Sequence, residues 1–166
     1  FALLVVTNPK LLDLDAFHSL RKNGGVISIR GNALMKDLAG FSSLQRTGLI
    51  TIESNMALQR IAGFSCVDTM ETLSIGDNAS LRFVEGFGKL KRINYFGLIV
   101  RSNPLLEHIN GFRSLDQIHN KILVEENPAL TGCCCLYKGI TIGRNAAGCQ
   151  SKEEVIARGP CKKTRS

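Results

Sequence analysis

Apolar residues recur along this chain in short alternating stretches, spaced about two dozen positions apart. Ile50 and Ile52, for example, precede Asn55 with one residue between them, and the same arrangement returns in each neighbouring unit. Alternation with a period of two is typical of a β-strand that buries one face. The pattern therefore predicts one short strand in every unit.

An asparagine follows each predicted strand and sets the register of the repeat. It stands at Asn8, Asn32, Asn55, Asn78, Asn103 and Asn127, at spacings of 24, 23, 23, 25 and 24 residues. Nine residues after each of the first five asparagines comes a phenylalanine, at Phe17, Phe41, Phe64, Phe87 and Phe112. A unit this small buries little by itself, so it has to stack on copies of itself as a solenoid.

Stacking turns each sequence column into a ladder of like residues. Neighbouring strands would form a parallel sheet about 4.8 Å apart, and the phenylalanines would form a spine in the core. An asparagine amide carries donors and an acceptor, so it can satisfy backbone groups in its own coil and in the next. We therefore expect an all-β solenoid of six coils, each of 23–25 residues.

The longest form of the unit, Asn103-Pro-Leu-Leu-Glu-His-Ile-Asn-Gly-Phe-Arg-Ser-Leu115, resembles the repeat of the receptor L-domain. Leucine-rich repeats share the strand and its asparagine, but they place the next Leu two residues later, whereas here the apolar position is three later. The resemblance covers roughly residues 2–132. It implies a right-handed parallel β-solenoid that recognises a protein or a glycan through its outer strand face.

The chain departs from that family at its first coil. Receptor L-domains usually begin with a capping helix and a cysteine, and neither is found here. Phe1 already lies in the first strand by register, so the first coil is expected to expose one face. A neighbouring domain or subunit could stack there. In that alternative the protein is a structural or assembly subunit of a surface layer, filament or appendage.

Five of the six cysteines lie between positions 133 and 161, after the repeats. Such a cluster indicates a disulfide-stapled C-terminal cap, an oxidising compartment and an extracellular or cell-surface location. The candidate disulfide partners are Cys134, Cys135, Cys149 and Cys161, whose connectivity stays open. A zinc site is disfavoured, because no Cys-x-x-Cys pair is present. The chain thus divides into repeats at 1–132, a cap at 133–161 and a basic tail at 162–166.

Three further features of the sequence concern a lone cysteine, an additional strand and a possible glycosylation site. Cys66 stands alone in the third repeat and is expected to be a free thiol. Ile140-Thr-Ile-Gly-Arg-Asn145 is one more strand with its asparagine, 18 residues after Asn127. Asn78-Ala-Ser80 matches the N-glycosylation pattern, but a buried ladder amide could not carry a glycan.

Net charge and composition exclude few classes of function. The net charge of +7 favours weak attraction to anionic partners, and no apolar run is long enough to span a membrane. The outward strand positions stack no carboxylates for acid–base catalysis or metal binding, and no phosphate-binding loop is present. We therefore expect no enzymatic activity, no cofactor, no metal and no nucleic acid partner; a carbohydrate-cleaving β-helix is the remaining enzymatic alternative.

The outward strand positions are the candidate binding face. These positions hold Arg30, Glu53, Ile99, Arg101, Leu123 and Glu125. A purely structural alternative is that the two Arg–Glu couples are only cross-strand charge pairs on adjacent coils. Adjacent outward apolar residues on neighbouring strands instead favour a surface that a partner covers.

Overall fold

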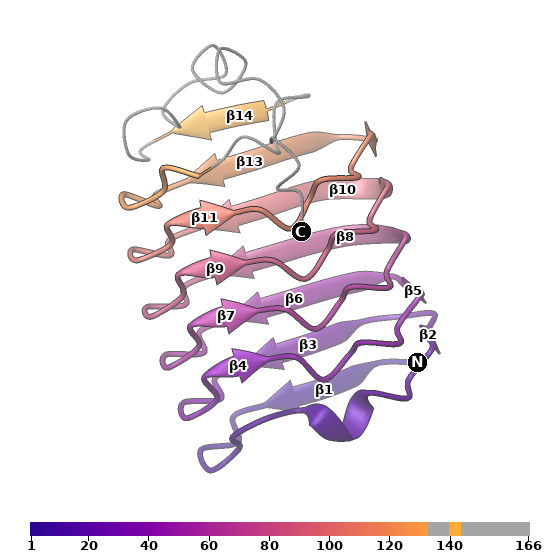
Figure 1. The fold of residues 1–166 in the computed structure, drawn as a ribbon, viewed down its shortest axis with the longest axis vertical. Coiled ribbons are helices and arrows are strands. Elements are labelled where there is room, and N and C mark those ends of the chain that lie inside the picture. Colours follow the sequence, from indigo (N-terminus) through magenta and orange to yellow (C-terminus); the bar gives the residue numbers. More distant parts are fainter. Residues whose placement is uncertain (133–139, 144–166) are drawn as a thin grey trace, which may run out of the picture.

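The computed structural model describes residues 1–132 and the strand at 140–143, and it is an all-β solenoid of parallel strands. One long sheet runs the length of the stack (Figure 1). Its strands follow the chain in order: β1 (Leu3–Val6), β3 (Ile27–Arg30), β6 (Leu49–Glu53), β8 (Thr69–Gly76), β10 (Arg92–Arg101), β13 (Lys121–Glu125) and β14 (Ile140–Gly143).

Short strands line the other sides of each coil. A second parallel sheet lies on the side facing the long sheet in Figure 1, and it contains β4 (Asp37–Leu38), β7 (Arg60–Ile61), β9 (Phe83–Val84) and β11 (His108–Ile109). At a corner before the long strands lie β2 (Lys22–Asn23), β5 (Arg46–Thr47) and β12 (Gln117–Ile118). The helical content of the described residues is one 3₁₀ turn, η1 (Asp15–Phe17).

Strand register confirms the repeat spacing residue for residue. Leu3 pairs with Ile27, Ile27 pairs with Ile50, and the next offsets along the sheet follow the spacings of the asparagines. Residues 1–132 hold six long-sheet strands and the five complete turns between them. Strand β14 confirms the additional predicted strand, since Ile140 pairs with Ile122 at an offset of 18.

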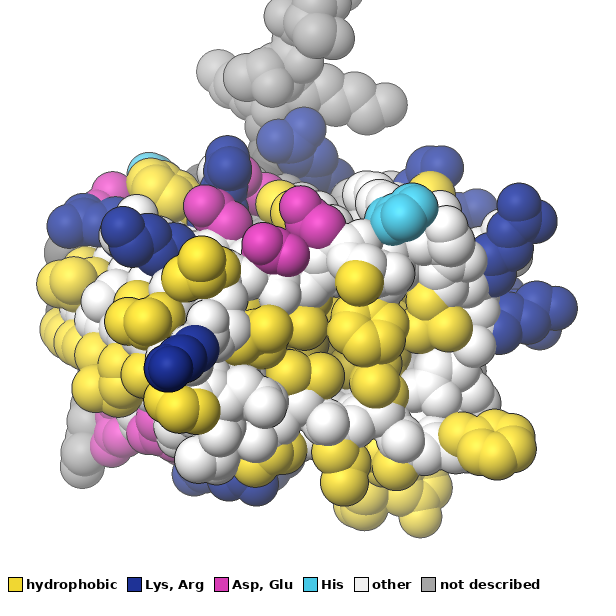
Figure 2. Space-filling view, turned by 90° about the horizontal axis from the view of Figure 1, so that it is seen from below, with side chains coloured by type: hydrophobic (Ala, Val, Ile, Leu, Met, Phe, Trp, Pro, Cys, Tyr) yellow, Lys and Arg dark blue, Asp and Glu magenta, His cyan; other side chains and the backbone are white. Residues whose placement is uncertain are grey.

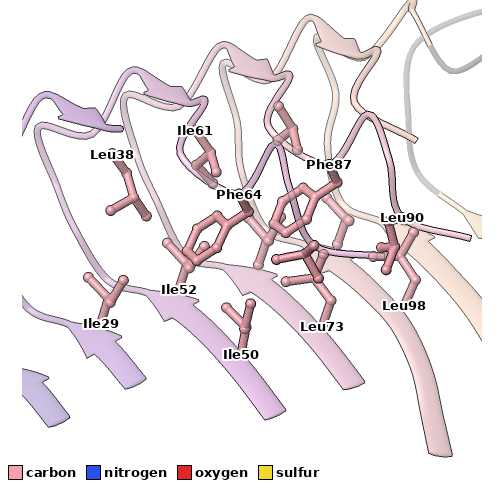
Figure 3. Packing of buried hydrophobic residues seen from close by; sticks show 14 of the residues in the cluster. Ile29, Leu38, Ile50, Ile52, Ile61, Phe64, Leu73, Phe87, Leu90 and Leu98 are labelled. Carbon is pink, nitrogen blue, oxygen red and sulfur yellow. The ribbon is translucent and has the colours of Figure 1, made fainter. Parts of the chain in front are cut away.

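The phenylalanine column forms a continuous stack of rings through the core. The centroid of Phe64 lies 5.0 Å from that of Phe41 and 5.1 Å from that of Phe87, with interplanar angles of 7° and 3°. Figure 3 shows the Phe64 and Phe87 rings side by side among aliphatic side chains from the strands. The four later rings are fully buried, whereas Phe17 in the first coil is half-buried.

The asparagine column joins every coil to the next. The backbone N–H and the Nδ2 atom of Asn32 both donate to the Oδ1 atom of Asn55, at 3.1 and 3.2 Å. The Nδ2 atom of Asn55 also donates to the carbonyl oxygens of Ile29 and Glu53. The asparagines from Asn32 to Asn127 are fully buried, so the amide satisfies backbone groups that water cannot reach.

The residue before each ladder asparagine adopts a left-handed backbone conformation. Its φ lies between 52° and 65° at Thr7, Gly31, Ser54, Asp77, Ser102 and Glu126. Only one of these six is glycine, although L-residues with a side chain disfavour this region. The asparagine hydrogen bonds therefore hold the turn in a conformation that most of its own residues do not prefer.

Strand β10 contains a bulge that breaks the regular pairing. Ile93 pairs with Met70 and Gly97 with Thr72, so residues 94–96 of β10 lie opposite the single residue Glu71. Gly97 has a φ of 93°, and a Cβ there would lie 1.9 Å from the carbonyl oxygen of Lys121. Glycine is required at this position because the backbone of the next coil approaches so closely.

Candidate functional site

The outer side of the long sheet brings the six predicted face residues onto one surface. They lie on β3, β6, β10 and β13, with β8 between the two groups. In the first group the Nη2 atom of Arg30 lies 3.2 Å from the Oε2 atom of Glu53, which forms the predicted cross-coil ion pair. The Oγ atom of Ser74 donates to the other oxygen of Glu53 at 3.0 Å. These contacts hold the Glu53 carboxylate in place.

The second group has a different character. Ile99 on β10 pairs in register with Leu123 on β13, and both side chains are half-buried. Arg101 pairs in register with Glu125, but the Arg101 side chain runs over Gly76 of the preceding coil, where an added Cβ would lie 3.5 Å from its Cγ atom. The ion pairs within 4 Å among the described residues are Arg30–Glu53, Arg60–Asp37 and Arg82–Glu107. Arg101 is exposed and presents its guanidinium on the face.

Two aromatic residues on the β10 bulge were missed by the sequence reasoning. Tyr95 and Phe96 are 59% and 57% exposed, and their rings meet edge to face with centroids 4.4 Å apart. The backbone N–H of Phe96 donates to the Oγ1 atom of Thr72 at 3.2 Å, which anchors the bulge to β8. The sequence carried one signal, because the unit that contains these residues is two residues longer than the unit before it.

Phenylalanines outside the spine column are not confined to the core. Phe96 lies on the surface, and the Phe83 ring stacks on the His108 ring at the second sheet with a centroid distance of 5.9 Å.

A shallow depression of about 330 Å³ also opens at the start of β10. Its lining residues are Lys91, Arg92, Ser114, Asp116 and Gln117.

Other sequence predictions fall at buried or undescribed positions. Asn78 is fully buried and its Nδ2 atom donates to the carbonyl oxygens of Ile52 and Gly76, so it cannot accept a glycan in this fold. Cys66 is a free, half-buried thiol, as predicted. The disulfide candidates Cys134, Cys135, Cys149 and Cys161 lie outside the described residues.

The described residues contain no candidate metal site. Within them, no three side chains of His, Cys, Asp and Glu come together in a group that could hold a metal ion. Among the same residues, no helix has the length and apolar character to cross a membrane. Comparisons with protein-family models, curated proteins and solved structures find no match for this chain.

Proposed function

We propose that this domain is a non-enzymatic recognition module of the receptor L-domain type, displayed outside the cell, which binds another protein through the outer face of β8, β10 and β13. The single observation that carries the proposal is the exposed pair Tyr95 and Phe96 on the β10 bulge. Adjacent exposed aromatic side chains are typical of a surface that binds a partner.

The surroundings of the pair suit a protein partner. Ile99 and Leu123 supply aliphatic surface on the same sheet, and Arg101 supplies a cation without an ion-pair partner among the described acidic side chains. Aromatic residues and arginine dominate the energetics of protein interfaces, especially beside well-packed apolar contacts. The bulge is also anchored by the Phe96–Thr72 hydrogen bond, so little conformational freedom would be lost on binding.

The extracellular location rests on the sequence alone. The cysteines that follow the repeats suggest an oxidising compartment. The asparagine ladder and the phenylalanine spine provide a rigid support for the face, because hydrogen bonds join the successive asparagines from Asn8 to Asn127 and the rings stack from Phe17 to Phe112. Rigid display of a small aromatic patch is what a recognition role requires.

The test is a binding screen of the full chain against a displayed library of extracellular proteins and against a glycan array. The double variant Tyr95→Ala, Phe96→Ala should bind the selected protein at least about tenfold more weakly, with unchanged thermal unfolding, because both side chains are exposed. The matched control is Leu34→Ala, Met56→Ala, which removes two exposed apolar side chains at the turns after the ladder asparagines.

Two other outcomes of the binding screen would contradict the proposal. If the control variant loses binding and the aromatic variant does not, the recognition surface lies at the turns instead of on the sheet face. If the screen finds only glycan ligands whose binding needs Tyr95 and Phe96, the face is right and the partner class is wrong.

A further inference from the structure

We infer that the corner at the start of β10 and β12 is a binding site for a sulfated polysaccharide. The residues that carry this inference are Lys89, Lys91, Arg92 and Arg113, which form the basic corner. The inference is independent of the sheet-face proposal, because it uses none of the residues of that face. In Figure 2, Lys and Arg side chains project from the right-hand edge of the molecule, the side on which β2 and β5 lie in Figure 1.

The basic corner concentrates positive charge on two neighbouring coils. Its four side chains are exposed, and none of them forms an ion pair with an acidic side chain of the described residues. Asp68 and Asp116 flank Lys91 in the coils before and after, so the corner is positive on balance but not uniformly so. One coil earlier, the positions that match Lys89, Lys91 and Arg92 hold no cation, and they are Cys66, Asp68 and Thr69.

The backbone of the basic corner is held by both adjacent coils. The N–H of Lys91 donates to the carbonyl oxygen of Asp68 at 2.9 Å, and the carbonyl oxygen of Lys91 accepts from the N–H groups of Asp116 and Gln117, both at 3.0 Å. Arg92 pairs in register with Gln117 on the following coil. Because the backbone is already ordered, binding would restrict only the side chains of the cations.

The shallow depression of about 330 Å³ lies within this corner. Lys91 and Arg92 line it together with Ser114, Asp116 and Gln117. The Oγ atom of Ser114 donates to the carbonyl oxygen of Gly88 at 2.7 Å, so the hydroxyl oxygen remains as an acceptor. The volume is at the lower end of the range for ligand sites. It therefore suits one part of a polymer whose remainder lies along the exposed cations.

The lining matches a ligand that carries both anions and hydroxyl groups. Sulfate groups accept charge-assisted hydrogen bonds from Lys and Arg side chains. Sugar hydroxyls can exchange hydrogen bonds with the Gln117 amide and donate to the Asp116 carboxylate, which would repel the acidic side chains of a peptide. The described lining includes no aromatic ring for stacking a nucleic acid base and no apolar side chain for insertion into lipid. A sulfated polysaccharide satisfies both requirements.

One further cation extends the site along the stack. Arg46, Thr69 and Arg92 occupy a single register column, and Arg46 is exposed without an ion-pair partner among the described acidic side chains. The spacing of parallel strands places the Arg46 and Arg92 backbones about 10 Å apart. A linear polymer can contact both arginines, whereas a single sugar reaches only the depression. Longer sulfated chains should therefore bind more tightly than short ones.

The experiment measures binding of a sulfated oligosaccharide of the heparin type to the full chain by isothermal titration calorimetry at low and at physiological salt. The double variant Lys91→Gln, Arg92→Gln should bind this probe at least about tenfold more weakly and with a smaller salt dependence, because two charge-assisted contacts are lost. Its thermal unfolding should be unchanged, since both side chains are exposed.

The matched control is Lys10→Gln, Lys36→Gln, which removes the same charge at exposed positions two and four residues after the ladder asparagines. Because salt screens charges that do not touch the ligand, the control should weaken binding by less than about twofold. Two further probes, the desulfated oligosaccharide and poly-glutamate, should bind far more weakly than the sulfated probe.

Four results would overturn the inference. No binding of the sulfated probe at low salt would exclude the site, and equal losses in the two double variants would show that net charge alone attracts the probe. Equal binding of the desulfated probe would mean that the cations do not recognise the ligand. Equal binding of poly-glutamate would assign the corner to an acidic protein. Tyr95→Ala, Phe96→Ala should leave binding of the sulfated probe unchanged, so this inference and the sheet-face proposal can fail separately.

Discussion

The Oδ1 atom of Asn55 accepts hydrogen bonds from both the backbone N–H and the Nδ2 atom of Asn32, one coil earlier. Replacing Asn55 with alanine removes this acceptor. It also removes the hydrogen bonds that the Nδ2 atom of Asn55 donates to the carbonyl oxygens of Ile29 and Glu53. Since each buried group left without a partner costs about 1–3 kcal/mol, Asn55→Ala should lower the free energy of unfolding by about 3 kcal/mol or more. Urea denaturation followed by circular dichroism would measure the loss.

The control for this change is Asn8→Ala. Asn8 is exposed and lies at the open end, so water replaces much of what its amide provides. Its removal should cost about 1 kcal/mol or less. Equal losses at the two positions would mean that the ladder does not stabilise the fold through burial of its hydrogen bonds.

Thr47 holds a buried hydroxyl whose Oγ1 atom has no hydrogen-bond partner. Thr47→Val keeps the shape and removes the unsatisfied group, so it should raise the free energy of unfolding by about 1 kcal/mol. Thr72→Val is the matched change, and it should lower the free energy of unfolding by about 1 kcal/mol because its Oγ1 atom accepts from Phe96. Thermal unfolding should therefore shift in opposite directions, and a loss at Thr47 would contradict the buried, unpartnered state of its hydroxyl.

Gly31 is the one glycine among the six left-handed turn positions before the ladder. An added Cβ would meet nothing closer than 3.4 Å, so Gly31→Ala tests the backbone conformation alone. The change should cost about 1–2 kcal/mol. Gly24 has open space around it, and Gly24→Ala should be neutral or stabilising by up to about 1 kcal/mol. The two free energies of unfolding, measured by urea titration, should differ in this order.

Phe64 is stacked on both faces inside the core, while Phe17 has one ring neighbour and lies half-buried at the open end. Phe64→Ala should cost about 3–5 kcal/mol, because it removes buried contacts and leaves a cavity. Phe17→Ala should cost roughly half of that or less, since part of its surface is already in water. Guanidinium titrations of the two variants would show whether the spine contributes as a continuous stack.

The two Arg–Glu couples of the sheet face should behave differently in double-mutant cycles. Arg30 and Glu53 form an ion pair at 3.2 Å, and alanine cycles should give a coupling of about 0.5 kcal/mol that falls at high salt. Arg101 and Glu125 share a register position, but Arg101 runs over Gly76, so their coupling should be near zero. A larger coupling at the second couple would show that Arg101 turns toward β13 in solution.

Much of the fold follows from the identity of residues in columns. The positions of Asn55, Phe64, Ile50 and Ile52 predicted a parallel strand, a ladder and a core, and each lies fully buried as expected. Column patterns are informative because each residue of a solenoid packs against the residues of its own column in the coil before and in the coil after. The bulge at Tyr95 escaped this reasoning, since an insertion interrupts the columns and its side chains have no counterpart in the other coils.

The register of the coils follows from the residue pattern alone, because shifting one coil by a residue would turn its apolar side chains outward and separate Asn55 from Asn32. The arrangement of the outward side chains, in contrast, depends on packing in the folded molecule. Long residues such as Arg101 can lean toward either adjacent coil, and in the folded molecule the Arg101 side chain lies over Gly76 of the preceding coil. The exposure of the aromatic pair was decided in the same way, because residues 94–96 have a single residue of β8 opposite them and do not fit within the sheet.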